Sequence, residues 1–461
     1  MTPFPTLRIF PIRAMVCAAT LALAACAVGP NYQRPDAPPV DRYTRQPLPV
    51  ATVSADTAGG DAQRFLEGRN VPAHWWTAFG NDELDARVRA ALDHSPSIAS
   101  AQAALRQAQE DAAAARGGLF PSLDANVGAT RQKQSGAQFG GFGSGVGGFS
   151  SGPFTVYNAG VSVGYAFDIF GGVRRGVEAQ SALADYQRAQ LDATYLTLAA
   201  NVVTASLQEA SLREQLRANE QIADFQRKEL DIASKQQQIG AKSLADTLAV
   251  RSQLAVTEAT LPPLRKQLAS TQNQLATYLG VTPAQLQLKP LALDAVTLPL
   301  DIPVSLPSNV VAQRPDIRAA SALLHSVTAQ VGVATAAMLP QITLSGSAGS
   351  QVLHAGDLFS AGTGAWSIGL GLLQPLFHGG ELLHKKHAAS AGMDKAVADW
   401  QGTVLTAFQN VADALQALQF DAQGLAAQDA VEKSAAQRLD LTRIQYRVGA
   451  IDYLNLLDAE R

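Results

Sequence analysis

Cysteine is almost absent from this 461-residue chain, which contains only Cys17 and Cys26. Charged residues are also scarce, at 16%, against about a quarter in an ordinary globular domain. Much of the side-chain surface is therefore expected to be buried or to face something apolar. The formal net charge of −3 gives no electrostatic basis for binding nucleic acid. After the first 25 residues no apolar run reaches the length of a spanning helix, so any membrane crossing must use strands.

The first 25 residues predict a secretory signal peptide. Arg8 and Arg13 supply a short basic region, and the apolar run that follows is too short to span a bilayer. The residues up to Cys26 resemble a bacterial lipobox, which implies cleavage before Cys26 and acylation of that residue; a free structural cysteine is the alternative. Ala27 follows instead of an acidic residue, which in such lipoproteins implies release to the outer membrane. The mature chain would then have a charge of −5 and no cysteine for a disulfide.

The chain contains an internal repeat. Residues 96–129 align with residues 315–348, so that Pro96, Ile98, Leu105 and Pro121 each match an identical residue 219 positions later. Gly240 similarly matches Gly449 at a separation of 209. The first copy is longer by about ten residues in the region of the glycine-rich segment GGFGSGVGGFSSG, which we interpret as an exposed loop. Each copy predicts a helix, two short strands, a long helix, a glycine turn and a returning helix.

The predicted strands alternate apolar residues with small or polar ones. In residues 341–351, Ile342 and Leu344 share one face, while Thr343 and Ser345 share the other. Similar alternation occurs at about 122–132, 154–168 and 364–376, with aromatic residues near the strand ends. This pattern is typical of a membrane β-barrel with an aqueous lumen, although a soluble sandwich would show similar alternation. Because the smallest single-chain barrels need eight strands, several copies would have to contribute to one barrel.

The predicted helices are long. No proline occurs from Val173 to Ile239, and 1.5 Å per residue gives such a helix a length of about 100 Å. In the second copy, apolar residues step by four and three, the spacing of a left-handed coiled-coil seam: Val404, Phe408, Val411, Leu415 and Leu418. These patterns predict a wall of paired helices, with turns between helices at Gly240 and Gly449.

Five segments carry a family resemblance that extends over essentially the whole chain. They are CAVGPNYQRP, HWWTAFGNDELDARVRAAL, SLPSNVVAQRPDIRAA, QPLFHGGEL and YRVGAIDYLNLLDAER. Together they resemble the outer membrane factor family, the TolC-like exit ducts of tripartite efflux systems, and more narrowly its NodT-like lipoprotein branch. The resemblance implies an α+β membrane protein that forms a homotrimer, with four antiparallel strands per protomer in a twelve-stranded transmembrane β-barrel. It also implies coiled-coil hairpins that form a periplasmic α-barrel.

The implied function is a passive duct for small molecules such as drugs or toxic compounds. A periplasmic adaptor and an inner-membrane pump, of the resistance-nodulation-division or major-facilitator type, would be its partners, and the lipid of the bacterial outer membrane its surroundings. An outer membrane component of a protein secretion system and a non-channel coiled-coil lipoprotein are the alternatives. No catalysis and no cofactor are implied, and the sequence does not name the solute.

The resemblance places the adaptor-contacting tip at the two glycine turns. These residues are Ile239, Gly240, Ala241, Lys242 and Ser243 in the first copy and Val448, Gly449, Ala450, Ile451 and Asp452 in the second. Asp246, Tyr446 and Asp458 match gate positions of the family, and Asn455 stands where other members have aspartate. Ile451 replaces a gate arginine found in some members. We therefore hypothesise a gate with fewer ionic ties; the alternative for Asp246 is an ordinary solvated helix residue.

The expected organisation divides the chain into five parts: a signal peptide (1–25), a lipidated N-terminal tether (26–70), a first repeat (71–280), a linker (281–306) and a second repeat (307–461). The proline-rich stretch from Pro30 to Pro49 is interpreted as flexible. The second returning helix stops twelve residues after Gly449, where the first copy continues for forty. If Arg461 is the true end, we expect an incomplete or poorly stable trimer.

The sequence gives only weak indications of a nucleotide-binding, metal-binding or ligand-binding site. Gly143, Gly145 and Gly148 fit a nucleotide-binding glycine pattern, but no strand precedes them and no helix follows. Glu381, His384 and His387 have spacing that could gather them on one helix face, yet a polar junction is the preferred interpretation over a metal site. Trp75 and Trp76 are expected to pack in a core rather than to bind a ligand.

Overall fold

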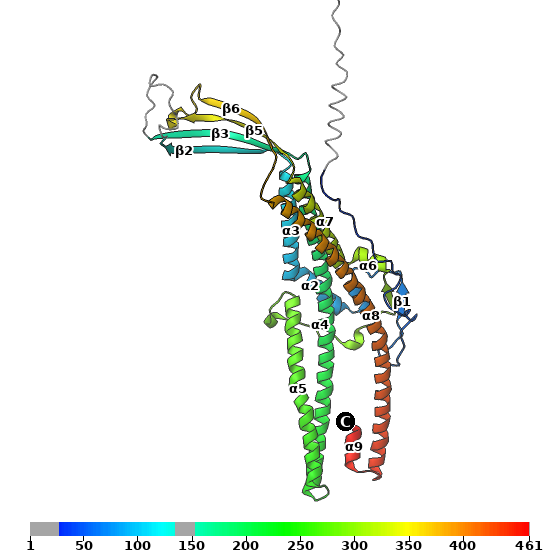
Figure 1. Cartoon of the computed structure of the whole chain (residues 1–461). Coiled ribbons are helices and arrows are strands. Elements are labelled where there is room, and N and C mark those ends of the chain that lie inside the picture. The colour runs from blue at the N-terminus through cyan, green and yellow to red at the C-terminus, as the bar shows by residue number, and fades with distance from the viewer. Residues whose placement is uncertain (1–26, 134–152, 461) are drawn as a thin grey trace, which may run out of the picture. The chain divides into compact units, whose positions relative to one another are not determined.

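A computed structural model of the protein describes residues 27–133 and 153–460. The expectations for the signal peptide, for acylation of Cys26, for the glycine-rich segment and for Arg461 lie outside these residues. The described chain divides into two compact units (Figure 1). We call them the strand unit (residues up to 34, 106–186 and 320–400) and the hairpin unit (residues 35–105, 187–319 and from 401 onward).

The strand unit contains one four-stranded sheet (Figure 1). Its strands are β2 (Ser122–Gln132), β3 (Phe154–Phe167), β5 (Gln341–Val352) and β6 (Gly364–Leu373), in the order β2-β3-β5-β6. Every neighbouring pair is antiparallel. The prediction of four antiparallel strands is confirmed. Among the described residues, β2 and β6 are each paired on one side only, so both edges of the sheet are open.

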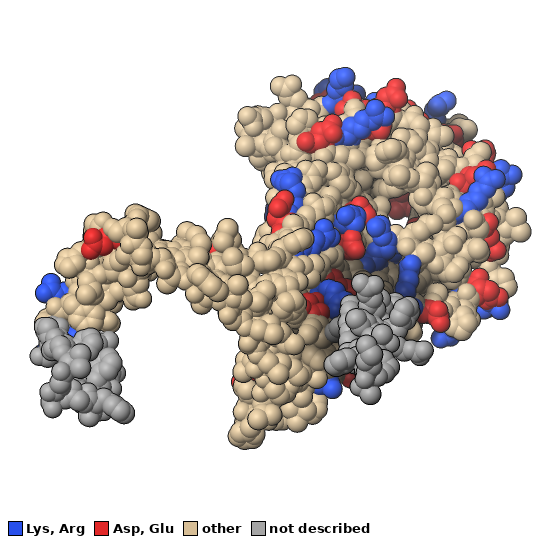
Figure 2. All heavy atoms as spheres, turned by 90° about the horizontal axis from the view of Figure 1, so that it is seen from above, with Lys and Arg blue, Asp and Glu red and all other residues tan. Residues whose placement is uncertain are grey.

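The register places most of the apolar residues of the four strands on one face. Leu123 lies opposite Val163, Val163 opposite Gly346, and Gly346 opposite Ile368. On the other face Asp124, Ser162, Ser347 and Ser367 follow one another across the sheet, and the hydroxyls of the two last serines lie 2.8 Å apart. Asp124 and Arg131 are the charged residues of the four strands, so Figure 2 shows a mostly tan strand surface. The sheet therefore has one apolar face and one small, polar face.

Four helices contribute residues to both units. They are α3 (Pro96–Gly117), α4 (Gly172–Gln238), α7 (Pro315–Ala336) and α8 (Glu381–Arg447). The two long ones have 67 residues each, consistent with the absence of proline from both. Within the described residues, no helix is both long and apolar enough to cross a bilayer.

The hairpin unit adds α2 (Asp82–His94), α5 (Leu244–Tyr278), α6 (Pro307–Gln313) and α9 (Tyr453–Glu460), together with short 3-10 turns such as η1 (Trp75–Phe79). Its apolar core joins η1, α2 and α4 through Trp76, Leu84 and Val202. Trp76 packs in this core, as predicted, and its indole Nε1 donates a hydrogen bond of 2.9 Å to Asp85. A tryptophan that satisfies its polar group in this way is a packing residue.

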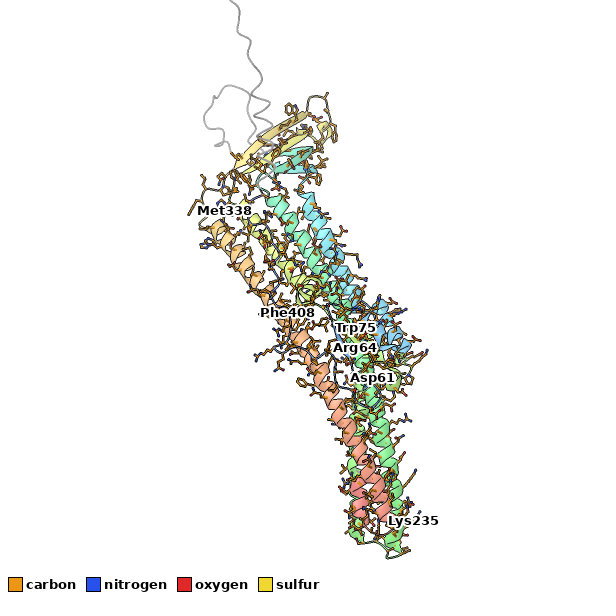
Figure 3. All side chains as sticks on the ribbon, turned by 90° about the vertical axis from the view of Figure 1, so that its right-hand side faces the viewer. Asp61, Arg64, Trp75, Lys235, Met338 and Phe408 are labelled. Atoms are coloured by element: carbon orange, nitrogen blue, oxygen red, sulfur yellow. The ribbon has the colours of Figure 1, made fainter. Side chains whose placement is uncertain are left out.

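The segment between residues 35 and 70, which includes most of the stretch expected to be flexible (Pro30–Pro49), packs against other parts of the hairpin unit. Strand β1 (Arg64–Glu67) pairs in parallel with β4 (Asp301–Val304). Its first residue, Arg64, is labelled in Figure 3. The ring of Tyr43 packs edge-on against Phe408 at 5.7 Å, and its hydroxyl donates to the carbonyl of Ser305 at 2.7 Å. Burial raises the pKa of Tyr43 to about 12. This part of the chain is thus built into the hairpin unit.

Candidate functional site at the hairpin turns

The first turn joins α4 to α5 and is fixed by a Schellman motif. Gly240 has a φ of +74°, a conformation that glycine adopts without the steric penalty of a Cβ. Its amide donates to the carbonyl of Gln237 at 3.0 Å, and the next amide, of Ala241, donates to Gln236 at 2.8 Å. These two bonds satisfy carbonyls that the end of α4 would leave without partners.

The second turn joins α8 to α9 and repeats the same geometry. Gly449 has a φ of +73° and donates to the carbonyl of Tyr446 at 3.0 Å, while Ala450 donates to Gln445 at 2.9 Å. The residue that precedes each glycine is large, apolar and exposed: Ile239 is 80% exposed and Val448 is 73% exposed. Equivalent backbones thus present equivalent apolar side chains to solvent at both turns.

Both returning helices begin with side-chain caps at matching positions. The Ser243 hydroxyl accepts the amide of Asp246 at 3.1 Å, and the Asp246 carboxylate accepts the Ser243 amide at 3.2 Å. In the second turn, Oδ1 of Asp452 accepts the backbone amide of Asn455 at 3.0 Å and its side-chain amide at 2.6 Å. Such caps stabilise a helix start by about 1 kcal/mol. Asp246 and Asn455, predicted as gate residues, therefore also close the first turn of their helices.

The remaining predicted gate residues lie on α8 and α9. Asp458 forms an ion pair with Arg438 across the second hairpin. Tyr446 is half-buried in the last turn of α8 and supplies its carbonyl to Gly449. Lys242 lies in the first turn, where burial lowers its pKa while the charges of Asp246 and Glu229 act in the opposite direction.

The first hairpin is tied together by polar cross-links along its length. Arg227 on α4 pairs with Glu258 on α5 at 2.8 Å, and Arg265 on α5 pairs with Glu220 on α4 at 2.8 Å. Between these pairs α5 contains Pro262 and Pro263, which cannot donate backbone hydrogen bonds inside a helix. The two ion pairs therefore bracket the weakest backbone of α5.

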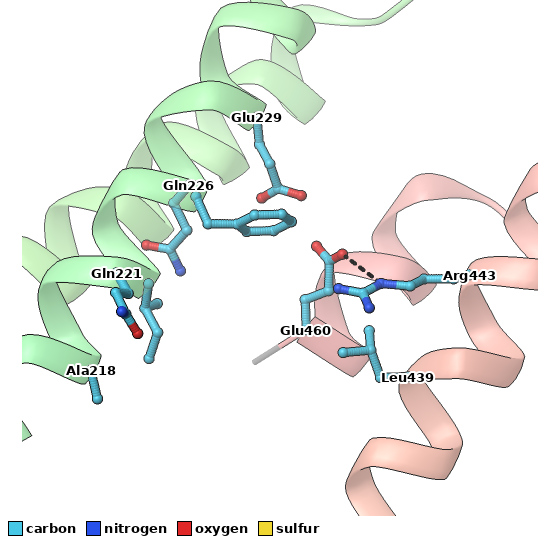
Figure 4. Close-up of a pocket in the computed structure, with 9 residues that line it drawn as sticks. Ala218, Gln221, Gln226, Glu229, Leu439, Arg443 and Glu460 are labelled. Atoms are coloured by element: carbon cyan, nitrogen blue, oxygen red, sulfur yellow. Dashed lines mark ion pairs between the residues drawn. The ribbon is translucent and has the colours of Figure 1, made fainter.

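A pocket of about 330 Å³ lies between the two hairpins (Figure 4). Ile222, Gln226 and Glu229 of α4 line one side, and Leu439 and Arg443 of α8 line the other together with Glu460 of α9. The guanidinium of Arg443 lies 3.7 Å from the Glu460 carboxylate. Sequence reasoning did not predict this pocket, because its walls come from residues more than 200 positions apart.

No arrangement of three or more potential metal-ligating side chains was found among residues 27–133 and 153–460. The rings of His384 and His387 lie 6.1 Å apart, and Glu381 forms an ion pair with Lys385 at 2.5 Å. These side chains lie in the first two turns of α8.

Comparison with known proteins agrees with this architecture. The chain matches the family described as Outer membrane efflux protein over residues 88–281 and 306–461. It is 30% identical to the pyoverdine export outer membrane protein OpmQ of Pseudomonas putida over 416 residues, which cover 90% of this chain and 87% of OpmQ. It is 29% identical to outer membrane protein OprJ of Pseudomonas aeruginosa over 459 residues, which cover 98% and 90% of the two chains.

Among solved structures, the outer-membrane channel OprN superimposes with a TM-score of 0.80 at 27% sequence identity, covering 95% of this chain and 93% of that chain. The family match extends over both glycine turns and all four strands of the sheet. The chain therefore belongs to the outer membrane efflux protein family, whose members are the outer membrane channels of efflux systems.

Proposed function

We propose that three copies of this chain close their sheets into one twelve-stranded barrel and act as a passive exit duct for small molecules. The observation that carries this proposal is the two-faced sheet with open edges. In a bilayer, the unpaired backbone groups of β2 and β6 must find partners, because lipid offers none. Pairing of β6 with β2 of a neighbouring copy would satisfy both edges.

The two faces of the sheet then have distinct roles. The apolar face carries Val127, Trp366, Ile368 and Leu370, all largely exposed in the single chain, and would meet the lipid. The opposite face carries mainly serine, glycine and asparagine, together with Asp124, and would line an aqueous lumen. Two copies would supply eight strands and three would supply twelve; the family resemblance favours three.

The partners follow from the hairpin turns and from the relatives. A periplasmic adaptor would contact the exposed apolar residues beside Gly240 and Gly449, and an inner-membrane pump of the resistance-nodulation-division or major-facilitator type would supply the energy. The name of OpmQ describes export of pyoverdine, a small molecule, which favours small solutes for this chain over proteins. Acylation of Cys26 would anchor the protein in the outer membrane.

The test is to express the chain with its signal, isolate outer membranes, and measure both assembly and conductance. We expect an unheated gel to show a trimer that dissociates on boiling, and planar bilayers to show discrete conductance steps. Trimers without conductance would point to a structural coiled-coil lipoprotein instead. Monomers in the outer membrane would contradict the shared barrel, because four strands cannot close one.

A further inference from the structure

The first described residues of the chain are seated in the strand unit. We call residues 27–32 the strap. The amide of Val28 donates to the carbonyl of Phe170 at 3.0 Å, directly before α4. Gly29 has a φ of +93°, and a methyl group added to it would lie 2.4 Å from the Cα of Gly332 on α7. Backbone-to-backbone contact this close leaves no room for a side chain on either residue.

A single buried arginine holds the strap. Arg175 on α4 is 5% exposed, although arginine is almost never buried without partners. Its Nε lies 3.3 Å from the Val28 carbonyl, and its Nη2 lies 2.6 Å from Oδ1 of Asn31 and 3.4 Å from the carbonyl of Gly29. The planar guanidinium thus donates to three groups of the strap at once, on Val28, Gly29 and Asn31, which the point charge of a lysine could not do.

The rest of the charge network closes on the end of the strap. Arg175 also pairs with Glu178 at 2.7 Å, and the other oxygen of Glu178 lies 2.9 Å from Nε2 of His325 on α7. The imidazole of His325 stacks on the ring of Tyr32, with centroids 4.4 Å apart and planes 17° apart. The strap is therefore held by α4 through hydrogen bonds to Val28 and Asn31, and by α7 through stacking on Tyr32.

The strap leads directly to the start of α4. A methyl group added to Gly171 would lie 2.8 Å from the Cα of Ala27, so Ala27 contacts the chain between β3 and α4. Cys26 is bonded to Ala27 and is therefore within one residue of this contact. An N-terminal anchor attached by a flexible tether would have no such restriction.

We propose that the strap is a docked element rather than a tether, and that Arg175 is the positioning residue that holds the acylated N-terminus beside the start of α4. The acyl chains would then enter the bilayer where β3 ends, at the base of the sheet. This second statement rests on the proposed function, because it needs Cys26 to be acylated; the docking of the strap does not.

The docking is tested by hydrogen exchange on the protein purified from outer membranes. The peptide containing residues 27–32 should exchange slowly in the wild type. Arg175→Lys keeps the charge beside Glu178 but loses the planar fork, and Gly332→Ala places a methyl group 2.8 Å from the Val28 carbonyl. Both should speed exchange of this peptide at least tenfold. Arg174→Lys is the matched control, because Arg174 is the adjacent residue and pairs with Asp168 instead.

Exchange of the β3 and β5 peptides, recorded in the same experiment, shows whether each variant has folded. If Gly332→Ala fails to fold, Asn31→Ala removes one contact from the strap itself and should speed exchange of the strap alone. Fast exchange of residues 27–32 in the wild type, or an unchanged rate in Arg175→Lys and Asn31→Ala, would overturn the docking.

The position of the anchor is tested with a photoactivatable palmitate supplied to the cells. Cross-links from the acyl group should concentrate on residues 165–175. A ten-residue Gly-Ser spacer between Cys26 and Ala27 should disperse them, whereas the same spacer between Arg34 and Pro35 should not. Evenly spread cross-links in the wild type would overturn the positioning. If the protein carries no acyl group, the proposed position of the anchor is wrong, but the hydrogen-exchange result on docking of the strap still holds. Conductance tests the duct separately.

Discussion

Arg87 and Glu209 form an ion pair in the interior of the hairpin unit. Nη1 of Arg87 lies 4.0 Å from Oε2 of Glu209, and their side chains are 3% and 0% exposed. Arg213 also pairs with Glu209, and Gln272 donates to it at 3.2 Å. This one carboxylate therefore joins α2, α4 and α5.

Glu209→Ala is expected to lower the free energy of unfolding by about 3–5 kcal/mol, because it leaves two arginines close together without their buried counter-charge. Urea unfolding of the solubilised protein measures the effect. Glu214→Ala is the control: Glu214 pairs with Arg217 on the surface of the same helix, and its loss should cost about 1 kcal/mol or less. If both substitutions lowered the free energy of unfolding equally, the buried pair would contribute no more to stability than the surface pair.

Two glycines of α8 and its turn should respond to alanine with opposite signs. Gly449→Ala forces a Cβ into a left-handed conformation and should destabilise by about 1–2 kcal/mol. Gly402 lies inside α8 with open space around it, so Gly402→Ala should stabilise by about 0.5–1 kcal/mol. Thermal unfolding compares the two variants. A stabilising Gly449→Ala would argue against the Schellman turn.

The two faces of β6 are distinguished by arginine at neighbouring positions. Ile368 lies on the apolar face and is 75% exposed in the single chain, so Ile368→Arg should reduce insertion into the outer membrane, at a cost of about 2–4 kcal/mol near the bilayer centre. Ser367 lies on the polar face, so Ser367→Arg should insert normally and shift the conductance toward anions. Fractionation and planar-bilayer recordings report the two outcomes. Normal insertion of Ile368→Arg would reverse the assignment of the faces.

The strap should loosen in acid. Burial raises the pKa of Glu178, but hydrogen bonds and charge from Arg175 and His325 outweigh it and leave the pKa below its ordinary 4.5. The stabilisation is therefore present above about pH 4.5 and is lost as the pH falls toward the lowered value. Hydrogen exchange of the strap between pH 7 and pH 3 measures this after correction for intrinsic rates. Glu178→Gln, which keeps His325, should flatten the dependence; an unchanged profile would place the acid sensitivity elsewhere.

The parts of this fold that follow a local period could be predicted from the sequence. Alternation in residues 341–351 specifies a two-faced strand, because adjacent side chains in a strand point to opposite faces. Gly240 and Gly449 mark turns, because their left-handed conformation favours glycine. The capping roles of Asp246 and Asn455 were missed, although each stands three residues after a Ser or Asp, a signal that is readable in the sequence.

The parts that depend on distant residues could not be predicted. Gly29 and Gly332 are about 300 positions apart, and neither lies in a periodic pattern that would pair them. The same holds for Arg87 and Glu209, whose burial becomes apparent only when α2 and α4 are placed side by side. The interpretation of Pro30–Pro49 as flexible rested on proline-rich composition, which describes the unfolded chain and does not reveal the surface against which a segment packs.

In the proposed barrel, the small polar face of the sheet would affect how fast solute can pass. Most of this face is serine and glycine, and Asp124 on β2 is the charged residue of the four strands that lies on it. Away from Asp124, a solute that moves along such a wall would exchange one weak hydrogen bond for another of similar strength, so its energy profile there would be nearly level. Discrimination between molecules would then be complete before they enter, and the last part of the route would differ little from diffusion in a narrow column of water.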